Sequence, residues 1–86
     1  MDGQHFVYIA ECADGSLYAG YTTDPERRIA THNAGKGAKY TRSRLPVRLV
    51  HTEGYATKPL AMKREAEIKR MTRGEKLRLI RACAGR

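Results

Sequence analysis

The sequence has few cysteines, no tryptophan and no long hydrophobic run. Its two cysteines, Cys12 and Cys83, are too few for a disulfide scaffold or a zinc site, so both classes of small protein are excluded. No stretch of about 18 apolar residues occurs, so we expect no membrane-spanning helix. The first residues lack a basic segment followed by an apolar run, so we expect no secretion signal and a reducing, cytoplasmic location.

The length and composition indicate one small globular domain. With 86 residues, the chain is expected to fold as a single domain over residues 1–86. A hydrophobic share of 41% with 30% charged residues is typical of a folded rather than a disordered chain. So short a chain supports one small core, so we expect any functional site to lie on its surface.

Acidic residues are scarce beyond the first third of the chain. Residues 1–26 contain five acidic side chains and no Lys or Arg, whereas residues 27–86 hold all 17 basic and four acidic side chains, a balance of +13. A basic segment of this size suits a polyanion, because each phosphate contact releases a counterion. Solvated surface charge is the alternative, and the strength of the asymmetry favours nucleic acid.

Two runs rich in β-branched and aromatic residues, 6–10 and 17–21, flank a turn signal and predict a β-hairpin. The residues alone leave the register of this hairpin open. A three-residue loop with Gly15 in the left-handed region places Tyr8 and Tyr18 on one face of the sheet. A two-residue turn places them on opposite faces.

The next segment is predicted to be a helix followed by a loop. A helix is expected over residues 25–33, because Thr23 or Asp24 can cap it and Pro25 suits its first turn. Residues 35–46 have no apolar period and several glycine or proline breakers, so they are predicted to form a loop.

The second half of the chain predicts one strand and two helices. Residues 47–52 alternate partly and indicate a third strand, and a helix is expected from the capping Thr57 to Met71. Thr72 and Glu75 have the spacing of a capping box and predict a final helix. The order β-β-α-β-α-α indicates an α+β fold, in which a small central three-stranded sheet is flanked by helices.

Three polar side chains on these helices are candidates for a functional site. Arg28 and His32 are four residues apart and share one helix face, which on this observation alone is better explained as an exposed basic surface. Glu65 lies beside the apolar stripe that includes Ile68, whereas Glu67 lies about 160° away among solvated positions. A carboxylate beside a core is costly unless it is paired, so Glu65 either forms a salt bridge with an arginine or binds Mg²⁺.

Residues 35–48, which comprise the predicted loop and the first two residues of the predicted third strand, carry five basic side chains and no acidic one. Such a pattern favours contact with a nucleic-acid backbone, and an interleaved tyrosine can stack on a base. The candidate binding residues are Lys36, Lys39, Tyr40, Arg42 and Arg44.

Five stretches in this order resemble the GIY-YIG nuclease superfamily. They are Phe6-Val7-Tyr8, Tyr18-Ala19-Gly20, the segment from Tyr18 to Asn33, Lys36 to Arg42, and Ala61 to Lys69. The last two are similar to the small stand-alone bacterial branch, close to the nuclease domain of enzymes that cut Holliday junctions and flaps. The first motif has Phe6 in place of its glycine, and Ala19 replaces a larger aliphatic residue in the second.

The resemblance implies a nuclease that uses Mg²⁺ or Mn²⁺ to cleave DNA phosphodiester bonds, as in DNA repair and recombination. By position, Tyr8 and Tyr18 would line the site, and Tyr18 would activate the attacking water. Arg28 would stabilise charge on the phosphate, His32 would support the site, and Glu65 would bind the metal ion. The same resemblance favours the bulged hairpin register.

The expected substrate is branched, flapped or single-stranded DNA, cut according to its structure rather than its sequence. The resemblance covers nearly the whole chain and leaves no accessory domain, so substrate affinity and specificity are expected either to be poor or to be supplied by an accessory protein. Two alternatives remain open: a nucleic-acid-binding module of the same fold without activity, and a nuclease that acts on RNA, since a basic loop does not distinguish the two sugars.

Overall fold

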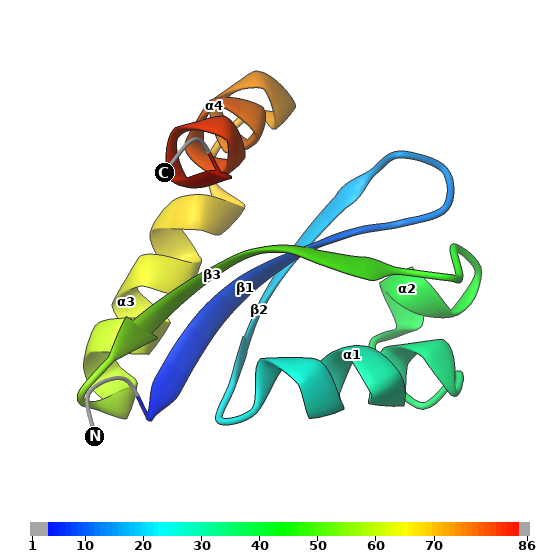
Figure 1. The fold of residues 1–86 in the computed structure, drawn as a ribbon, viewed down its shortest axis with the longest axis horizontal. Helices are drawn as coiled ribbons and strands as arrows, with labels where there is room; N and C mark the ends of the chain where they lie inside the picture. Colours follow the sequence, from blue (N-terminus) through cyan, green and yellow to red (C-terminus); the bar gives the residue numbers. More distant parts are fainter. Residues whose placement is uncertain (1–3, 85–86) are drawn as a thin grey trace.

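The structure, a computed structural model, describes residues 4–84 and contains one three-stranded antiparallel sheet with strand order β2-β1-β3. The helices pack around this sheet (Figure 1). The elements are β1 (His5–Glu11), β2 (Leu17–Thr22), α1 (Pro25–Asn33), α2 (Lys39–Arg42), β3 (Arg48–Tyr55), α3 (Lys58–Lys69) and α4 (Arg73–Ala84). The predicted α+β class and the predicted order of the main elements are confirmed. Within the described residues, no helix is long and apolar enough to cross a membrane.

The β1–β2 hairpin adopts the bulged form. Gly15 has a φ of +83°, a conformation that favours glycine, and its N–H donates to the carbonyl of Cys12. Ala10 therefore faces Tyr18 across the strand pair, and Tyr8 faces Gly20. Because neighbours two residues apart share a face, both tyrosines lie on the same side of the sheet.

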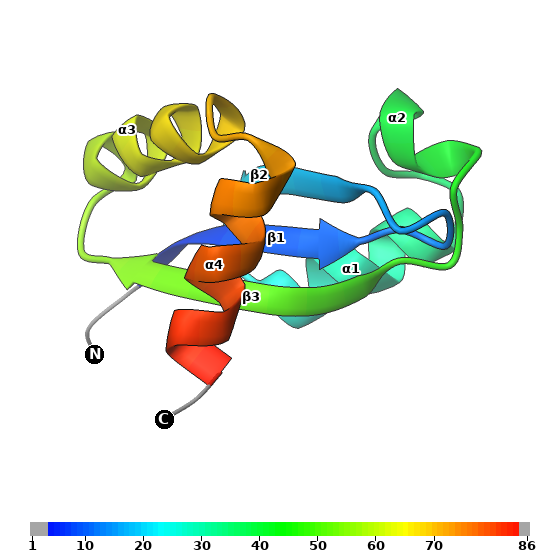
Figure 2. The same ribbon diagram turned by 90° about the horizontal axis from the view of Figure 1, so that it is seen from above.

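The core has one part on each face of the sheet. On one face, Val7 and Ile9 of β1 pack with Ala61 and Ile68 of α3, and all four are fully buried. On the other face, Tyr8 packs in a second cluster with residues of α1 and of the segment before β3. Helices α3 and α4 thus cover one face while α1 lies against the other, and α3 runs close to β2 (Figures 1 and 2).

The helix caps agree with the sequence predictions. Asp24 rather than Thr23 caps α1, since its side chain accepts from the N–H of Arg27. Thr57 caps α3 in the same way. Thr72 and Glu75 form the expected reciprocal capping box, in which each side chain accepts from the backbone N–H of the other residue.

Two predicted boundaries are wrong. Residues 35–46 do not form a continuous loop, because Lys39–Arg42 makes a one-turn helix, α2, that buries Thr41 completely. One turn is too short to give an apolar period, so the sequence contains no signal for it. The third strand runs from Arg48 to Tyr55 rather than ending at Thr52. Its extension pairs with the start of β1, where His5 faces Tyr55.

Candidate active site

The edge strand β2 is the part of the sheet that both layers of helices can reach. β2 pairs only with β1, α3 lies beside it, and the His32 ring of α1 reaches Tyr18 from the other face of the sheet. Tyr8 comes from β1, Tyr18 from β2, and Arg28 and His32 from α1. The ring centroids of Tyr8 and Tyr18 are 6.3 Å apart, and that of His32 is 5.5 Å from Tyr18, so three of the predicted residues form one cluster.

A buried chain of hydrogen bonds joins Tyr8 to His32 and Thr41. The Tyr8 hydroxyl is 2.8 Å from Nε2 of His32, and Nδ1 of His32 is 2.8 Å from Oγ1 of Thr41. The single hydroxyl proton of Thr41 is donated to the carbonyl of Ala38. Thr41 must therefore accept from His32 Nδ1–H, which leaves Nε2 to accept the proton of the Tyr8 hydroxyl.

Two glycines make room for this chain. A Cβ atom at Gly20 would lie 2.5 Å from the hydroxyl oxygen of Tyr8, and one at Gly37 would overlap the ring of His32. Neither glycine has a positive φ, so close approach rather than backbone conformation explains them. Gly20 is the last residue of the second sequence motif, whereas Gly37 and Thr41 are site residues that the sequence analysis did not identify.

Burial keeps both groups of the chain neutral near pH 7. Desolvation raises the pKa of the Tyr8 hydroxyl, and the nearby guanidinium of Arg28 opposes this shift. Desolvation lowers the pKa of His32, and the positive charge of Arg28 lowers it further. The carboxylate of Glu65 makes the smallest contribution to raising the Tyr8 pKa. Tyr8 is therefore a proton donor in this site and His32 a proton acceptor.

Arg28 is partly buried beside Tyr8 and forms no ion pair with a carboxylate within residues 4–84. Its Nε is buried and has no hydrogen-bond partner in the described part of the chain. Buried polar groups in folded proteins are normally satisfied, so this N–H is available to an anion that the protein itself does not supply.

Glu65 lies mostly buried, with 14% of its side chain exposed, and its ion-pair partner is Lys69 at 3.7 Å. That distance is long for a charge-assisted hydrogen bond, so the carboxylate is weakly paired. The prediction of a salt bridge to an arginine is wrong for Glu65. It holds for Glu67 instead, which is more exposed and pairs with Arg64 at 3.3 Å. Glu67 is exposed, as its helical phase predicted, and its pairing with Arg64 is a surface contact.

The Glu65 carboxylate fits a hard divalent cation that keeps several waters. Mg²⁺ is commonly held by one or two carboxylates together with water and substrate phosphate. Among the described residues, no group of three or more His, Cys, Asp or Glu side chains is placed to hold a metal ion. A metal ion at this edge would therefore rely on Glu65 as its protein ligand.

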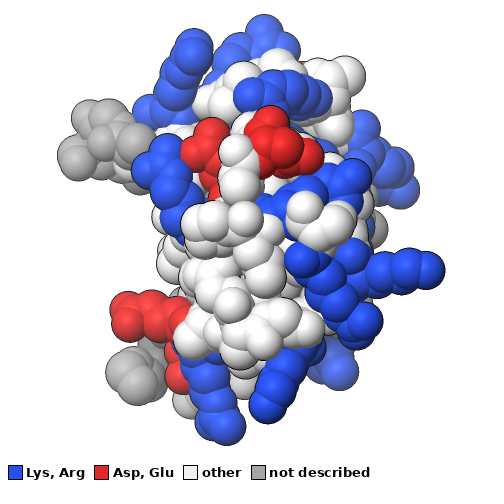
Figure 3. Space-filling view, turned by 90° about the vertical axis from the view of Figure 1, so that its right-hand side faces the viewer, with Lys and Arg blue, Asp and Glu red and all other residues white. Residues whose placement is uncertain are grey.

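The predicted binding residues divide into two groups. Tyr40 stacks on Tyr18 with ring centroids 6.0 Å apart, and the guanidinium of Arg44 lies 4.0 Å from the Tyr40 ring. Arg44 is also paired with Asp14 at 3.1 Å, so its charge is partly used within the protein. The remaining members are exposed: Lys36, Lys39 and Arg42. Figure 3 shows an uncharged patch on the side of the molecule that carries α2, bordered by many basic and a few acidic side chains.

A second polar cluster lies along the opposite edge strand, β3. Both oxygens of Glu53 accept hydrogen bonds, from Tyr55 at 2.7 Å, from His51 at 2.8 Å and from Arg64 at 2.8 Å and 3.3 Å. These partners outweigh the effect of burial and hold the pKa of Glu53 at about 2. The sequence analysis did not single out Glu53, whose partners His51 and Tyr55 lie on the same strand and whose partner Arg64 comes from α3.

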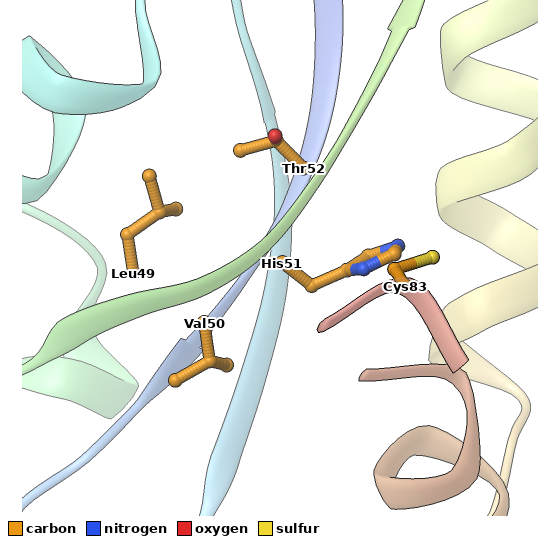
Figure 4. Close-up of a pocket in the computed structure, with 5 residues that line it drawn as sticks. All are labelled: Leu49, Val50, His51, Thr52 and Cys83. Atoms are coloured by element: carbon orange, nitrogen blue, oxygen red, sulfur yellow. The ribbon is translucent and has the colours of Figure 1, made fainter. Parts of the chain in front are cut away.

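A pocket beside this cluster is unlike a phosphate site. His51 and Cys83 lie side by side in it, as Figure 4 shows. The other lining residues are Leu49, Val50 and Thr52. None of the five is Lys or Arg, so the pocket does not offer the charge that a phosphodiester requires.

Comparisons with known proteins agree with the geometry. The family model described as the GIY-YIG catalytic domain matches residues 4–78. A UPF0213 protein of Natronomonas pharaonis is 58% identical over 80 residues, which cover 93% of this chain and 94% of the relative. A UPF0213 protein of Staphylococcus haemolyticus is 60% identical over 77 residues, which cover 90% of this chain and 94% of the relative.

Two solved structures are also similar. The solution NMR structure of a UPF0213 protein from Bacillus halodurans has a TM-score of 0.60 and 54% identity, and the match covers 91% of this chain and 83% of that one. The solution NMR structure of a protein from E. faecalis has a TM-score of 0.63 and 43% identity, and the match covers 100% of this chain and 94% of that one.

Proposed function

Because the chain belongs to the GIY-YIG catalytic domain family, we propose that it is a metal-dependent endonuclease that hydrolyses DNA phosphodiester bonds. One observation carries this proposal. Arg28 is partly buried and has no carboxylate partner within residues 4–84, and Glu65 is mostly buried and only weakly paired. A phosphate and a divalent cation are the ligands that would satisfy these two charges together.

Tyr18 is the residue proposed to activate the attacking water. Its hydroxyl has no hydrogen-bond partner within residues 4–84, whereas the hydroxyl of Tyr8 is already bound to His32. A tyrosine is a poor base at neutral pH, so Tyr18 needs help from neighbouring positive charge to accept a proton from water. Tyr8 stays protonated and holds its place between the sheet and α1, and His32 and Thr41 fix its hydroxyl.

Arg28 is proposed to bind the non-bridging oxygens of the phosphate and to stabilise the charge that develops there. Its planar guanidinium presents several N–H donors, a geometry that suits phosphate. Glu65 would hold Mg²⁺ or Mn²⁺, which when bound neutralises phosphate charge and lowers the pKa of its bound water.

The proposed substrate is DNA whose structure, rather than sequence, directs cleavage: branched, flapped or single-stranded. The exposed Lys36, Lys39 and Arg42 would track the backbone without reading base edges. An accessory protein is proposed to add specificity.

The test compares labelled duplex, flap, junction and single-stranded DNA, with RNA alongside, in the presence of Mg²⁺ or Mn²⁺. Wild type should cleave at least one structured DNA, and Glu65→Gln should lose cleavage while keeping its DNA affinity. Glu67→Gln is the matched control, because it makes the same change on the same helix at a carboxylate paired with Arg64. Cleavage by Glu65→Gln at the wild-type rate would remove the metal-binding role, and no cleavage of any substrate by wild type would favour a binding module.

A further inference from the structure

A pocket of about 330 Å³ adjoins the proposed active site on the outer side of β2. It shares Tyr18 with the site, and four of its other lining residues are Leu17, Ala19, Tyr40 and Lys76. The sixth is Lys69, the ion-pair partner of Glu65. The pocket therefore touches both the proposed water-activating tyrosine and the cation beside the proposed metal ligand.

The lining suits one nucleotide. The stacked rings of Tyr18 and Tyr40 form an aromatic wall with an interplanar angle of 23°, and Tyr40 remains 42% exposed. The guanidinium of Arg44 lies 4.0 Å from the centre of the Tyr40 ring, so a nucleobase of any sequence would stack on the part of this wall that remains exposed. Lys69 and Lys76 add two positive charges, which a phosphate would neutralise. Aromatic and cationic groups thus meet in a space of nucleotide size.

Lys69 has two possible partners in this arrangement. At present its ammonium lies 3.7 Å from a Glu65 oxygen, and about half of the Lys69 side chain is exposed, so the pair is weak and the lysine can move. While Lys69 stays beside Glu65, it competes with a metal ion for the same carboxylate. A phosphate in the pocket would offer the lysine another anion.

We infer that this pocket binds a nucleotide of the DNA strand beside the cleaved phosphate, and that the nucleotide draws Lys69 away from Glu65 and so favours metal binding. The inference rests on the proposed function, since it takes Glu65 as the metal ligand. Coupling between two ligands is reciprocal, so the metal ion must also strengthen nucleotide binding by the same factor. This coupling would favour metal binding by protein that is already bound to DNA.

Mn²⁺ binding to the full chain, followed by the electron paramagnetic resonance signal of the free ion, measures this coupling without any cleavage. Thymidine 5′-monophosphate serves as the nucleotide, and the Mn²⁺ that it binds without protein is subtracted. In wild type, saturating nucleotide should tighten Mn²⁺ binding about two- to fivefold, the range expected for releasing a half-exposed ion pair. Chemical shifts of the Tyr18 and Tyr40 rings should report nucleotide binding in the same samples.

Lys69→Gln should bind Mn²⁺ more tightly than wild type without nucleotide and should show no further gain when the nucleotide is added. Lys63→Gln is the matched control, because it removes one charge from the same helix and Lys63 has no ion pair within residues 4–84. This control should retain the wild-type coupling.

The outcomes separate this inference from the proposed function. If Glu65→Gln abolishes Mn²⁺ binding but the nucleotide leaves wild-type affinity unchanged, the coupling is overturned and the metal site stands. If the tyrosine signals do not respond to the nucleotide, the pocket assignment is overturned. If Glu65→Gln binds Mn²⁺ as wild type does, the metal site and this inference are overturned together.

Discussion

Two polar clusters lie along opposite edge strands of the same small sheet, and they differ in how fully their charges are paired. On β3, the Glu53 carboxylate accepts from three different side chains. At the β2 edge, the Nε of Arg28 has no partner in the described structure and Glu65 has a lysine at 3.7 Å. Arg64 and Glu65 are consecutive residues of α3, but they belong to different clusters. Arg64 pairs with Glu53 at the β3 edge, whereas Glu65 pairs only weakly with Lys69.

This difference distinguishes a charge that stabilises the fold from a charge that is available to bind a ligand. A carboxylate with several donors gains from ionisation in the folded state, which is why the pKa of Glu53 falls to about 2. A buried N–H without an acceptor, such as that at Nε of Arg28, costs free energy that a ligand can return. The Glu53 cluster should therefore respond to mutation through stability, and the Arg28 and Glu65 positions through activity.

A large effect on cleavage at the β2 edge is expected from Arg28→Ala. Loss of a positioned donor to the reacting phosphate should slow cleavage about 100-fold or more. DNA binding should weaken modestly, and the free energy of unfolding should hardly change, because Arg28 has no ion-pair partner within residues 4–84. Single-turnover cleavage and urea denaturation measure the two quantities.

Arg27→Ala is the control for Arg28→Ala, because the neighbouring arginine is exposed on the same helix. It should cleave at close to the wild-type rate. If Arg28→Ala cleaves normally but has a lower free energy of unfolding, Arg28 stabilises the fold as Glu53 does. The proposed difference between the two edges would then be wrong.

On the β3 edge, Glu53→Gln should destabilise the protein by on the order of 3 kcal/mol at pH 7, because each pKa unit corresponds to about 1.4 kcal/mol. The folded pKa lies below the ordinary value of 4.5, so this stabilisation is present above that pH and is lost as the pH falls toward 2. Urea denaturation between pH 2 and pH 7 should show that loss in wild type and a flatter profile in the variant. Equal stability of the two proteins at pH 7 would contradict the structural role.

His32 should make the protein less stable in mild acid. Its pKa is lowered in the folded state by burial and by Arg28, so the unfolded chain binds the proton first as the pH falls below the ordinary value of 6.5. The resulting slope is at most about 1.4 kcal/mol for each pH unit. His32→Gln should reduce this slope between pH 7 and pH 5.5, whatever its absolute stability, and an unchanged slope would show that His32 titrates normally.

The smallest effect is expected outside both clusters, at the basic residues of α2. Replacing Lys39 and Arg42 together should weaken binding to all DNA sequences alike and reduce the salt dependence by up to about two phosphate contacts. Replacing Arg78 and Arg81 on α4 removes the same charge from exposed positions that lie outside the predicted loop. If both double variants change the salt slope equally, α2 has no special contact with the backbone.

The sequence predicted most of the fold, but it did not predict the residues that hold the side chains of the site in place. Strong local signals predicted the hairpin, the caps at Asp24 and Thr57 and the capping box at Thr72, because each depends on residues close in the chain. The register of Tyr8 against Tyr18 needed the resemblance, since two turn types fit the same residues. The helical phase of Glu65 beside Ile68 was correct.

The missed features depend on contacts between distant segments. Thr41 supports His32 from a single helical turn that has no apolar period, and Gly37 matters only because the His32 ring occupies the space of its missing side chain. The partners of Glu53 come from β3 and α3, and no local pattern indicates that Arg64 rather than another cation would reach it. The lack of a partner for Arg28 is likewise a property of the assembled fold.

The most direct test of this account measures cleavage and unfolding free energy together for Glu65→Gln and Glu53→Gln. Both variants replace one carboxylate by an amide of similar size. Glu65→Gln should lose cleavage and keep the wild-type unfolding free energy. Glu53→Gln should lose stability and, at a temperature where it remains folded, cleave at close to the wild-type rate. The opposite pattern, with Glu65→Gln active and destabilised and Glu53→Gln stable and inactive, would contradict the assignment of the two edges.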